Sequence, residues 1–241
     1  TSRTLAGILV TVAAMVALAT TDAVTKHLSA TFAIVQILWV RYVVYAGYGA
    51  WSAFRARRGE AFRTRGAGLQ IGRALLLVVA NMVVVYSFSR LPLAYVHAVI
   101  AVAPLVVTAL SVWTLGESVD TLRWLAVGVG FLGVLVILQP SLAVDSISVV
   151  AVAPLVGALL YATYQILTKL VTRNDGPETT QLYTGLIGLV CFSCAAPFYW
   201  TTPDPVEWVW LGVAAVRGTL AHALIVVGLH LAPASVVQPF N

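Results

Sequence analysis

The sequence predicts an all-α, polytopic integral membrane protein. Hydrophobic residues make up 60% of the 241 residues, charged residues only 10%, and the mean hydropathy is +0.94. A soluble domain carries about 25% charged residues, and a soluble chain of this length cannot bury so much apolar surface within itself. Lipid is therefore the solvent for most of the chain, which excludes both a soluble domain and a disordered chain.

The lengths of the apolar segments set the expected membrane spans. A bilayer core about 30 Å thick requires about 20 apolar residues per helix. A ninth span begins at Ala232, but the residues up to Asn241 rise only about 15 Å in a helix, so we expect it to be truncated here. Before it, eight complete spans are predicted, at Leu5–Leu28, Ala33–Phe54, Leu69–Phe88, Leu93–Trp113, Leu122–Leu138, Ser148–Lys169, Thr180–Tyr199 and Val206–Gly228.

The distribution of basic residues predicts the orientation in the membrane. The loop after the second span carries Arg55, Arg57, Arg58, Arg63 and Arg65, whereas the loops on the opposite side are poor in Lys and Arg. Because these residues accumulate in cytoplasmic loops, we expect the N-terminus to lie in the cytoplasm. This asymmetry also explains the net charge of +5, so we expect the lipid bilayer as a partner and no nucleic acid.

Two pairs of segments repeat at nearly constant spacing. Ser89–Val99 matches Leu229–Pro239 at an offset of 140 residues, and Thr25-Lys26 matches Thr168-Lys169 at an offset of 143. Because five is an odd number of helices, a second five-helix repeat is inverted in the membrane, which is the architecture of secondary transporters with a site near the midplane. The predicted repeats, of which the second lacks its tenth helix in this chain, are residues 1–140 and 141–241.

Short motifs along the whole chain resemble those of a known family. They are Thr25-Lys26, Arg41, Asn81, LPLAYVHAVIAVAPL followed by LGES, and, in the second half, YATYQILTK, His222 and LAPASVVQPFN. Their order and spacing are similar to the EamA-type ten-helix branch of the drug/metabolite transporter superfamily. This resemblance implies an alternating-access carrier of small organic metabolites in a bacterial cytoplasmic (inner) membrane. Thr184 departs from the pattern, because it stands where the inverted copy of Arg41 falls.

Three charged residues, Asp22, Arg41 and Arg217, lie six or more residues inside the predicted spans, where each costs about 2.5–3.5 kcal/mol on insertion scales and needs a partner or a function. Asp22 lies roughly 9 Å inside the outer end of the first span, and Arg41, about eight residues inside the same end of the second span, lies at a comparable depth. They are expected either to form a structural pair between neighbouring helices or to act as a gate or substrate contact. Replacing one member of such a pair leaves the other charge uncompensated.

Arg217 lies in the middle of the eighth span, and the sequence places no acid at its depth. A guanidinium there favours an anion, because it binds carboxylate or phosphate through two parallel hydrogen bonds. We expect Tyr95 and His97 to approach it from the fourth span. The alternative is that Arg217 binds backbone carbonyls or lies nearer the membrane interface, in which case the site shifts to the second span, to Trp39, Arg41 and Tyr42.

Further polar and aromatic residues inside the spans complete the expected cavity, with core packing as the competing explanation for each. An aromatic cavity with one cation suits an amino acid or a similar amphipathic solute with a carboxylate. Protons are a candidate coupling ion, with Asp22 as the acid to carry them. The additional candidates for substrate contact are Asn81, Tyr161, Tyr164 and His222.

The alternative function is a membrane-embedded transferase or hydrolase acting on a lipid-linked substrate. Such enzymes gather acids and histidines at one depth, whereas eight of the nine acids here fall in predicted loops or at span ends. The sequence contains no HExxH, GxSxG or phosphate-loop motif. We therefore expect a carrier with a small-molecule substrate, and no catalytic residues, metal or cofactor.

Overall fold

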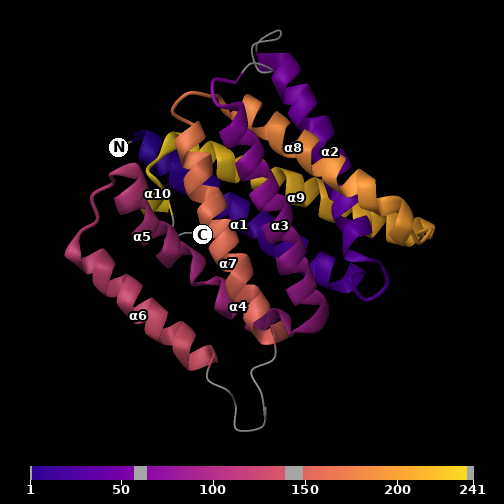
Figure 1. Cartoon of the computed structure of the whole chain (residues 1–241), viewed down its shortest axis with the longest axis horizontal. Helices are drawn as coiled ribbons and strands as arrows, with labels where there is room; N and C mark the ends of the chain where they lie inside the picture. The colour runs from indigo at the N-terminus through magenta and orange to yellow at the C-terminus, as the bar shows by residue number, and fades with distance from the viewer. Residues whose placement is uncertain (1, 57–63, 139–148, 238–241) are drawn as a thin grey trace.

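The computed structural model describes residues 2–56, 64–138 and 149–237, and these residues fold into helices with no strand among them (Figure 1). This confirms the all-α membrane fold class. In chain order the elements are α1 (Ser2–Leu28), α2 (Ile34–Ala56), α3 (Ala67–Arg90), α4 (Leu93–Ile100), α5 (Ala103–Leu115), α6 (Thr121–Leu138), α7 (Val149–Val171), α8 (Pro177–Ala195), the 3₁₀ turn η2 (Ala196–Tyr199), α9 (Pro205–Leu231) and α10 (Ala234–Val237).

The helices follow the predicted spans closely. α10 is the described part of the expected ninth span, whose last residues, 238–241, lie outside the described residues. Within the described chain, six segments are long and apolar enough to cross a bilayer: Arg3–Leu28, Ala67–Arg90, Leu93–Leu115, Val150–Val171, Pro177–Tyr199 and Pro205–Leu231.

The fourth predicted span differs from expectation, because it is divided into α4 and α5 at Ala101 and Val102. Pro104 is the second residue of α5. Proline has no backbone N–H and fits only the first turn of a helix without disruption. Because α5 begins at Ala103, Pro104 falls in its first turn, where proline is tolerated.

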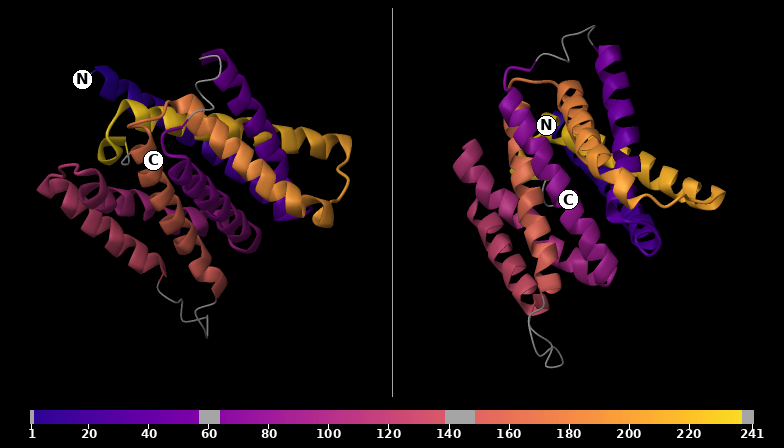
Figure 2. Two further views of the ribbon diagram at one scale, coloured as in Figure 1. Left: turned by 45° about the horizontal axis from the view of Figure 1, so that its top comes forward. Right: turned by 45° about the vertical axis from the view of Figure 1, so that its right-hand side comes forward.

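Helices from the two halves of the chain pack in pairs: α1 with α9, α2 with α8, and α3 with α7 (Figures 1 and 2). α5 also packs on α7, and α6 lies at the edge of the bundle. Glycines permit close approach at these crossings. A Cβ atom on Gly185 of α8 would lie 2.7 Å from the Cα of Ala46 in α2, and one on Gly157 of α7 would lie 2.8 Å from Val84 in α3.

Two lysines make matching contacts at opposite ends of the bundle. Lys26, near the end of α1, donates through Nζ to the carbonyls of Phe88 and Leu91 at the end of α3. Lys169, near the end of α7, donates to the carbonyls of Leu229 (2.6 Å) and Ala232 (2.7 Å) at the end of α9. Each ammonium thus satisfies carbonyls at the negative end of a helix dipole. We call the Lys26 end the outer end and the Lys169 end the inner end, following the predicted orientation.

Candidate functional site

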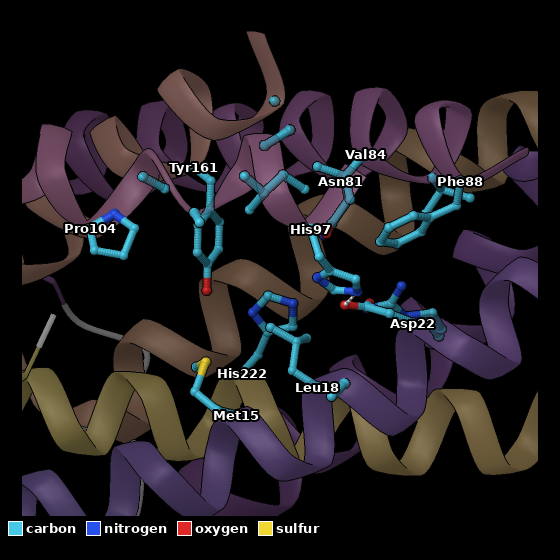
Figure 3. Close-up of a pocket in the computed structure, with 18 residues that line it drawn as sticks. Met15, Leu18, Asp22, Asn81, Val84, Phe88, His97, Pro104, Tyr161 and His222 are labelled. Carbon is cyan, nitrogen blue, oxygen red and sulfur yellow. Dashed lines mark ion pairs between the residues drawn. The ribbon is translucent and has the colours of Figure 1, made fainter. Parts of the chain in front are cut away.

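A cavity of about 330 Å³ lies between helices of both halves of the chain (Figure 3). Its walls come from α1, α2, α3, α7 and α9 and from the α4–α5 junction. Most of the wall is apolar, and the polar side chains on it are Asp22, Arg41, Asn81, His97, Tyr161 and His222. Apolar walls with a few polar groups, at this volume, are typical of small-molecule sites.

Arg41 supplies the positive charge of the cavity. It extends from α2, and its side chain is 8% exposed. Its guanidinium lies against Gly218 of α9, where an added Cβ would be 3.0 Å from Nε and 3.1 Å from Nη2. Within the described residues the guanidinium forms no hydrogen bond and no ion pair closer than 4 Å. Its donors are therefore available to an anion.

The Asp22 carboxylate and the His97 imidazole lie next to each other at the outer part of the cavity. The Oδ2 atom of Asp22 lies 3.7 Å from Nε2 of His97, with side chains 13% and 42% exposed (Figure 3). Arg41 lines the same cavity and interacts electrostatically with Asp22. The sequence leaves open whether Asp22 and Arg41 form a structural pair or act as a gate; among the described residues, the basic side chain within 4 Å of the Asp22 carboxylate is His97.

Three further residues present hydrogen-bonding groups. Asn81 is oriented by Tyr42, because its Nδ2 donates to the Tyr42 hydroxyl at 3.0 Å. The Tyr161 hydroxyl points into the cavity (Figure 3). This hydroxyl and Nδ1 of His222 are buried without a hydrogen-bond partner in the part of the chain that the structure describes. Buried polar atoms in native proteins are nearly always paired, so a solute or water in the cavity is the natural partner for both.

Arg217 lies outside this cavity, which differs from the expectation that it supplies the cation. Its side chain is exposed, and Nη1 donates to Thr20 Oγ1 of α1 at 2.7 Å. The sequence gives the depth of a residue along a helix but not the rotation of that helix. One residue further on, about 100° around the axis, Gly218 faces Arg41.

The side chains of the four remaining candidates make their contacts outside the cavity. Tyr95 donates to the carbonyl of Ala151 at 3.2 Å, and Trp39 donates to Ser193 at 3.0 Å. Tyr42 packs its ring on α8, where a Cβ on Gly188 would overlap it. Tyr164 is fully buried with its ring beneath an arginine, Arg73. Of these four, Tyr42 supports the cavity through Asn81.

Arg73 is a buried charge that the sequence analysis misses. It extends from α3 near the inner end and is 0% exposed. It donates to Gln70 Oε1 (3.0 Å), the Thr180 carbonyl (2.7 Å) and Thr184 Oγ1 (2.6 Å). In the sequence it lies close to a predicted span end, where arginine is common at the membrane interface. The repeat offset of 143 gives Thr184 as the counterpart of Arg41. Arg73 lies beside Thr184 in the structure, so the missing arginine at residue 184 is the one indication of Arg73 in the sequence.

Gln70 continues this network to the loop between α7 and α8. Its Nε2 donates to Asp175 Oδ2 at 2.8 Å, and Asp175 also accepts from the hydroxyl of Thr64 and the backbone of Arg65. Together with Thr180 and Thr184, these groups form what we call the inner network: Arg73, Gln70, Asp175, Thr180 and Thr184. It joins α3 of the first half to α8 and to the loop between α7 and α8 of the second.

The chemistry available in the cavity is that of binding. Among the described residues, no group of three or more His, Cys, Asp or Glu side chains is placed to hold a metal. One guanidinium, one carboxylate–imidazole pair and several uncharged polar groups line mainly apolar walls. Groups of these kinds are those that bind amphipathic small molecules in proteins, with a guanidinium suited to an anionic end.

A bundle of membrane-crossing helices around such a cavity defines the class as a membrane transport protein. The particular family follows from the sequence. Residues 5–139 match the model of the EamA-like transporter family, and the chain belongs to this family. The membrane-enzyme alternative is set aside by this membership.

Named relatives carry two kinds of substrate. The chain is 28% identical over 184 residues to a riboflavin transporter of Vibrio cholerae, covering 76% of this chain and 61% of the relative. It is 29% identical over 192 residues to a riboflavin transporter of Brucella anthropi, covering 76% and 66%. An S-adenosylmethionine uptake transporter of Rickettsia bellii is 24% identical over 173 residues, covering 72% and 59%. The chain thus spans less than two thirds of the length of each of these three relatives.

Proposed function

We propose that this protein is a secondary transporter that carries a small amphipathic metabolite with a carboxylate across a bacterial cytoplasmic membrane. The observation that carries the proposal is Arg41, a buried guanidinium on the cavity wall without a hydrogen bond among the described residues. A buried cation stabilises an anionic solute strongly, since it provides two parallel donors in a site of low dielectric constant.

We further propose that the solute moves by alternating access between two inverted repeats. The cross-packing of α1 with α9 and of α7 with α3 supports this symmetry, as do the matching contacts of Lys26 and Lys169. Such repeats place the substrate between the halves, and rocking of one half opens the site to each side in turn. The cavity found here has walls from both halves.

The names of the relatives are compatible with this class of solute. S-adenosylmethionine has a carboxylate at its amino-acid end and a planar purine at the other, and the cavity offers Arg41 for the first and apolar walls with the Tyr161 ring for the second. An amino acid such as tryptophan has the same two parts. Riboflavin is planar but lacks a carboxylate, so a riboflavin carrier is the second candidate, favoured by the relatives from Vibrio cholerae and Brucella anthropi.

A counterflow assay in proteoliposomes tests the proposal. The purified protein is reconstituted, and exchange of labelled tryptophan, S-adenosylmethionine, riboflavin and tryptamine is measured, tryptamine being tryptophan without its carboxylate. We expect exchange of at least one carboxylate-bearing probe and little exchange of tryptamine. Arg41→Gln should reduce this exchange by roughly tenfold or more, because a charge-assisted hydrogen bond contributes about 1.5–3 kcal/mol.

Arg217→Gln is the matched control, because it removes the same charge from a membrane helix but outside the cavity. It should exchange the probe at nearly the rate of the unmodified protein. Exchange of riboflavin alone, unaffected by Arg41→Gln, would replace the carboxylate proposal with the second candidate. Loss of exchange in Arg217→Gln with retention in Arg41→Gln would return the site to the position expected from the sequence.

A further inference from the structure

We propose that Asp22 and His97 together hold a coupling proton, and that this proton binds when a carboxylate binds Arg41, so that solute and proton cross together. The proposal deepens the proposed function and rests on it. The observation is that an acid, an imidazole and an available guanidinium line one cavity, with Asp22 and His97 at 3.7 Å from each other (Figure 3).

The argument begins with the charge of the empty cavity. Asp22 is largely buried inside α1, where an isolated carboxylate is costly. Arg41 compensates this charge by electrostatic interaction, and the His97 imidazole lies 3.7 Å from the carboxylate. Arg41 in turn has Asp22 as its acidic partner in the described chain. The empty cavity is therefore balanced, with the Arg41 donors still unoccupied.

A solute carboxylate on Arg41 upsets this balance. It adds a second negative charge near Asp22 and takes up the guanidinium that compensated it. Binding of one proton by the Asp22–His97 pair restores the original charge. Because linkage is reciprocal, a proton on the pair also releases Arg41 from Asp22 and strengthens carboxylate binding by the same factor. Solute and proton therefore favour each other in the cavity.

The position of His97 gives the proton a route. Its side chain is 42% exposed and reaches from α4 to the Asp22 carboxylate on the cavity wall (Figure 3). Histidine exchanges protons near neutral pH. The other ionisable or charged groups around Asp22 are Lys26 on α1, Arg41 on α2, Tyr161 on α7 and His222 on α9, while α3 contributes uncharged Asn81 and Phe88. Lys26 is held by the carbonyls at the end of α3, and His222 is buried against Tyr45.

The experiment separates solute exchange from proton coupling in the same proteoliposomes. Counterflow of tryptophan and of S-adenosylmethionine is measured at equal pH on both sides. Net accumulation is then measured with a pH gradient of one unit, acidic outside, while valinomycin and potassium hold the membrane potential at zero. One proton per solute corresponds to about tenfold accumulation under this gradient. Pyranine inside the vesicles reports proton entry when tryptophan or S-adenosylmethionine is added.

We expect the unmodified protein to accumulate at least one of these probes and to acidify the vesicle interior. Asp22→Asn should lose accumulation and acidification, with residual counterflow that no longer varies with pH. Asp22→Glu retains an ionisable group and should retain accumulation. His97→Asn should slow acidification. His27→Asn, an exposed histidine at the outer end of α1, is the matched control and should accumulate the probe normally.

Contrary results are distinguishable. Normal counterflow of tryptophan or S-adenosylmethionine without any effect of the pH gradient in the unmodified protein would overturn the coupling and leave the proposed function intact. Loss of counterflow in Asp22→Asn, together with loss of probe binding, would make Asp22 a solute contact and also overturn the coupling. Absence of counterflow with both carboxylate probes would overturn the proposed function, and the coupling with it.

Discussion

At the scale of single residues, two buried arginines have different environments. Arg73 is held by several acceptors of the inner network and lies over the ring of Tyr164. Arg41 lies against a glycine, Gly218, with its donors open to the cavity. An arginine whose hydrogen bonds are satisfied by the protein is structural, whereas one whose donors are available can bind solute. The sequence identifies Arg41 as an intramembrane charge but contains no direct indication of how either side chain is satisfied.

Replacement of Arg73 should destabilise the protein. Arg73→Gln removes the guanidinium donors to Gln70 Oε1, the Thr180 carbonyl and Thr184 Oγ1, and each buried acceptor left without a partner costs about 1–3 kcal/mol. Thermal unfolding in detergent should therefore shift to clearly lower temperature. Arg217→Gln removes an exposed arginine with one hydrogen bond to Thr20 and should shift it little. Equal shifts in the two variants would contradict the structural role of Arg73.

The position of the Arg41 guanidinium should depend on the absence of a side chain at residue 218. Gly218→Ala places a Cβ about 3 Å from the guanidinium, so Arg41 has to move and its alignment with a carboxylate is lost. Exchange of the carboxylate probe should fall while unfolding temperature changes little. Gly212→Ala, on the same helix with no atom within 4 Å of the added Cβ, should exchange normally. Unchanged exchange in Gly218→Ala would argue against binding at Arg41.

At the scale of elements, the sequence predicts where the described helices begin and end better than how they are rotated. Apolar segments separated by Pro, Gly and Asp locate these helices, because the bilayer fixes their length. The rotation of a helix about its axis depends on the helices that pack against it, and those helices come from distant parts of the sequence. Arg217 and Gly218 illustrate the consequence, since adjacent residues lie on different faces of α9. The division of α4 from α5 also depends on local geometry around Pro104, which the apolar pattern leaves open.

The crossing of α2 and α8 should tolerate no added bulk at Gly185. A Cβ there would lie 2.7 Å from the backbone of Ala46, so Gly185→Leu forces the helices apart, and overpacking of this kind typically costs about 1–3 kcal/mol. The variant should unfold at lower temperature in detergent. Gly47→Leu adds the same side chain to an open face of α2 and should be tolerated. Similar unfolding temperatures for both would show that the crossing is looser than described.

At the scale of the whole molecule, the repeat offset in the sequence corresponds to matching contacts in space. Lys26 and Lys169 each bind the end of the third helix of their own half, and Ser29 and Thr172 each donate to the carbonyl of that lysine, at 2.8 and 2.7 Å. These pairs share the offset of 143 found in the sequence. The side-chain composition is less symmetric, because the counterpart of Arg41 is Thr184 and the guanidinium beside it comes from Arg73. At the inner end, hydrogen bonds of Arg73 therefore join α3 to α8. Arg41, by contrast, lines a cavity.

If the two halves are inverted, residues at the same offset should lie on opposite sides of the membrane. Ala30 and Arg173 differ by 143 positions and are both exposed, next to the outer and inner ends of α1 and α7. In a protein whose Cys191 and Cys194 are replaced by serine, Ala30→Cys should react with a membrane-impermeant thiol reagent in intact cells. Arg173→Cys should react only after the membrane is opened, because we expect the arginine-rich loops, and with them the inner end, to face the cytoplasm. Labelling of both positions from the same side would refute the inversion, whereas an exchanged pattern would preserve the inversion and reverse the orientation.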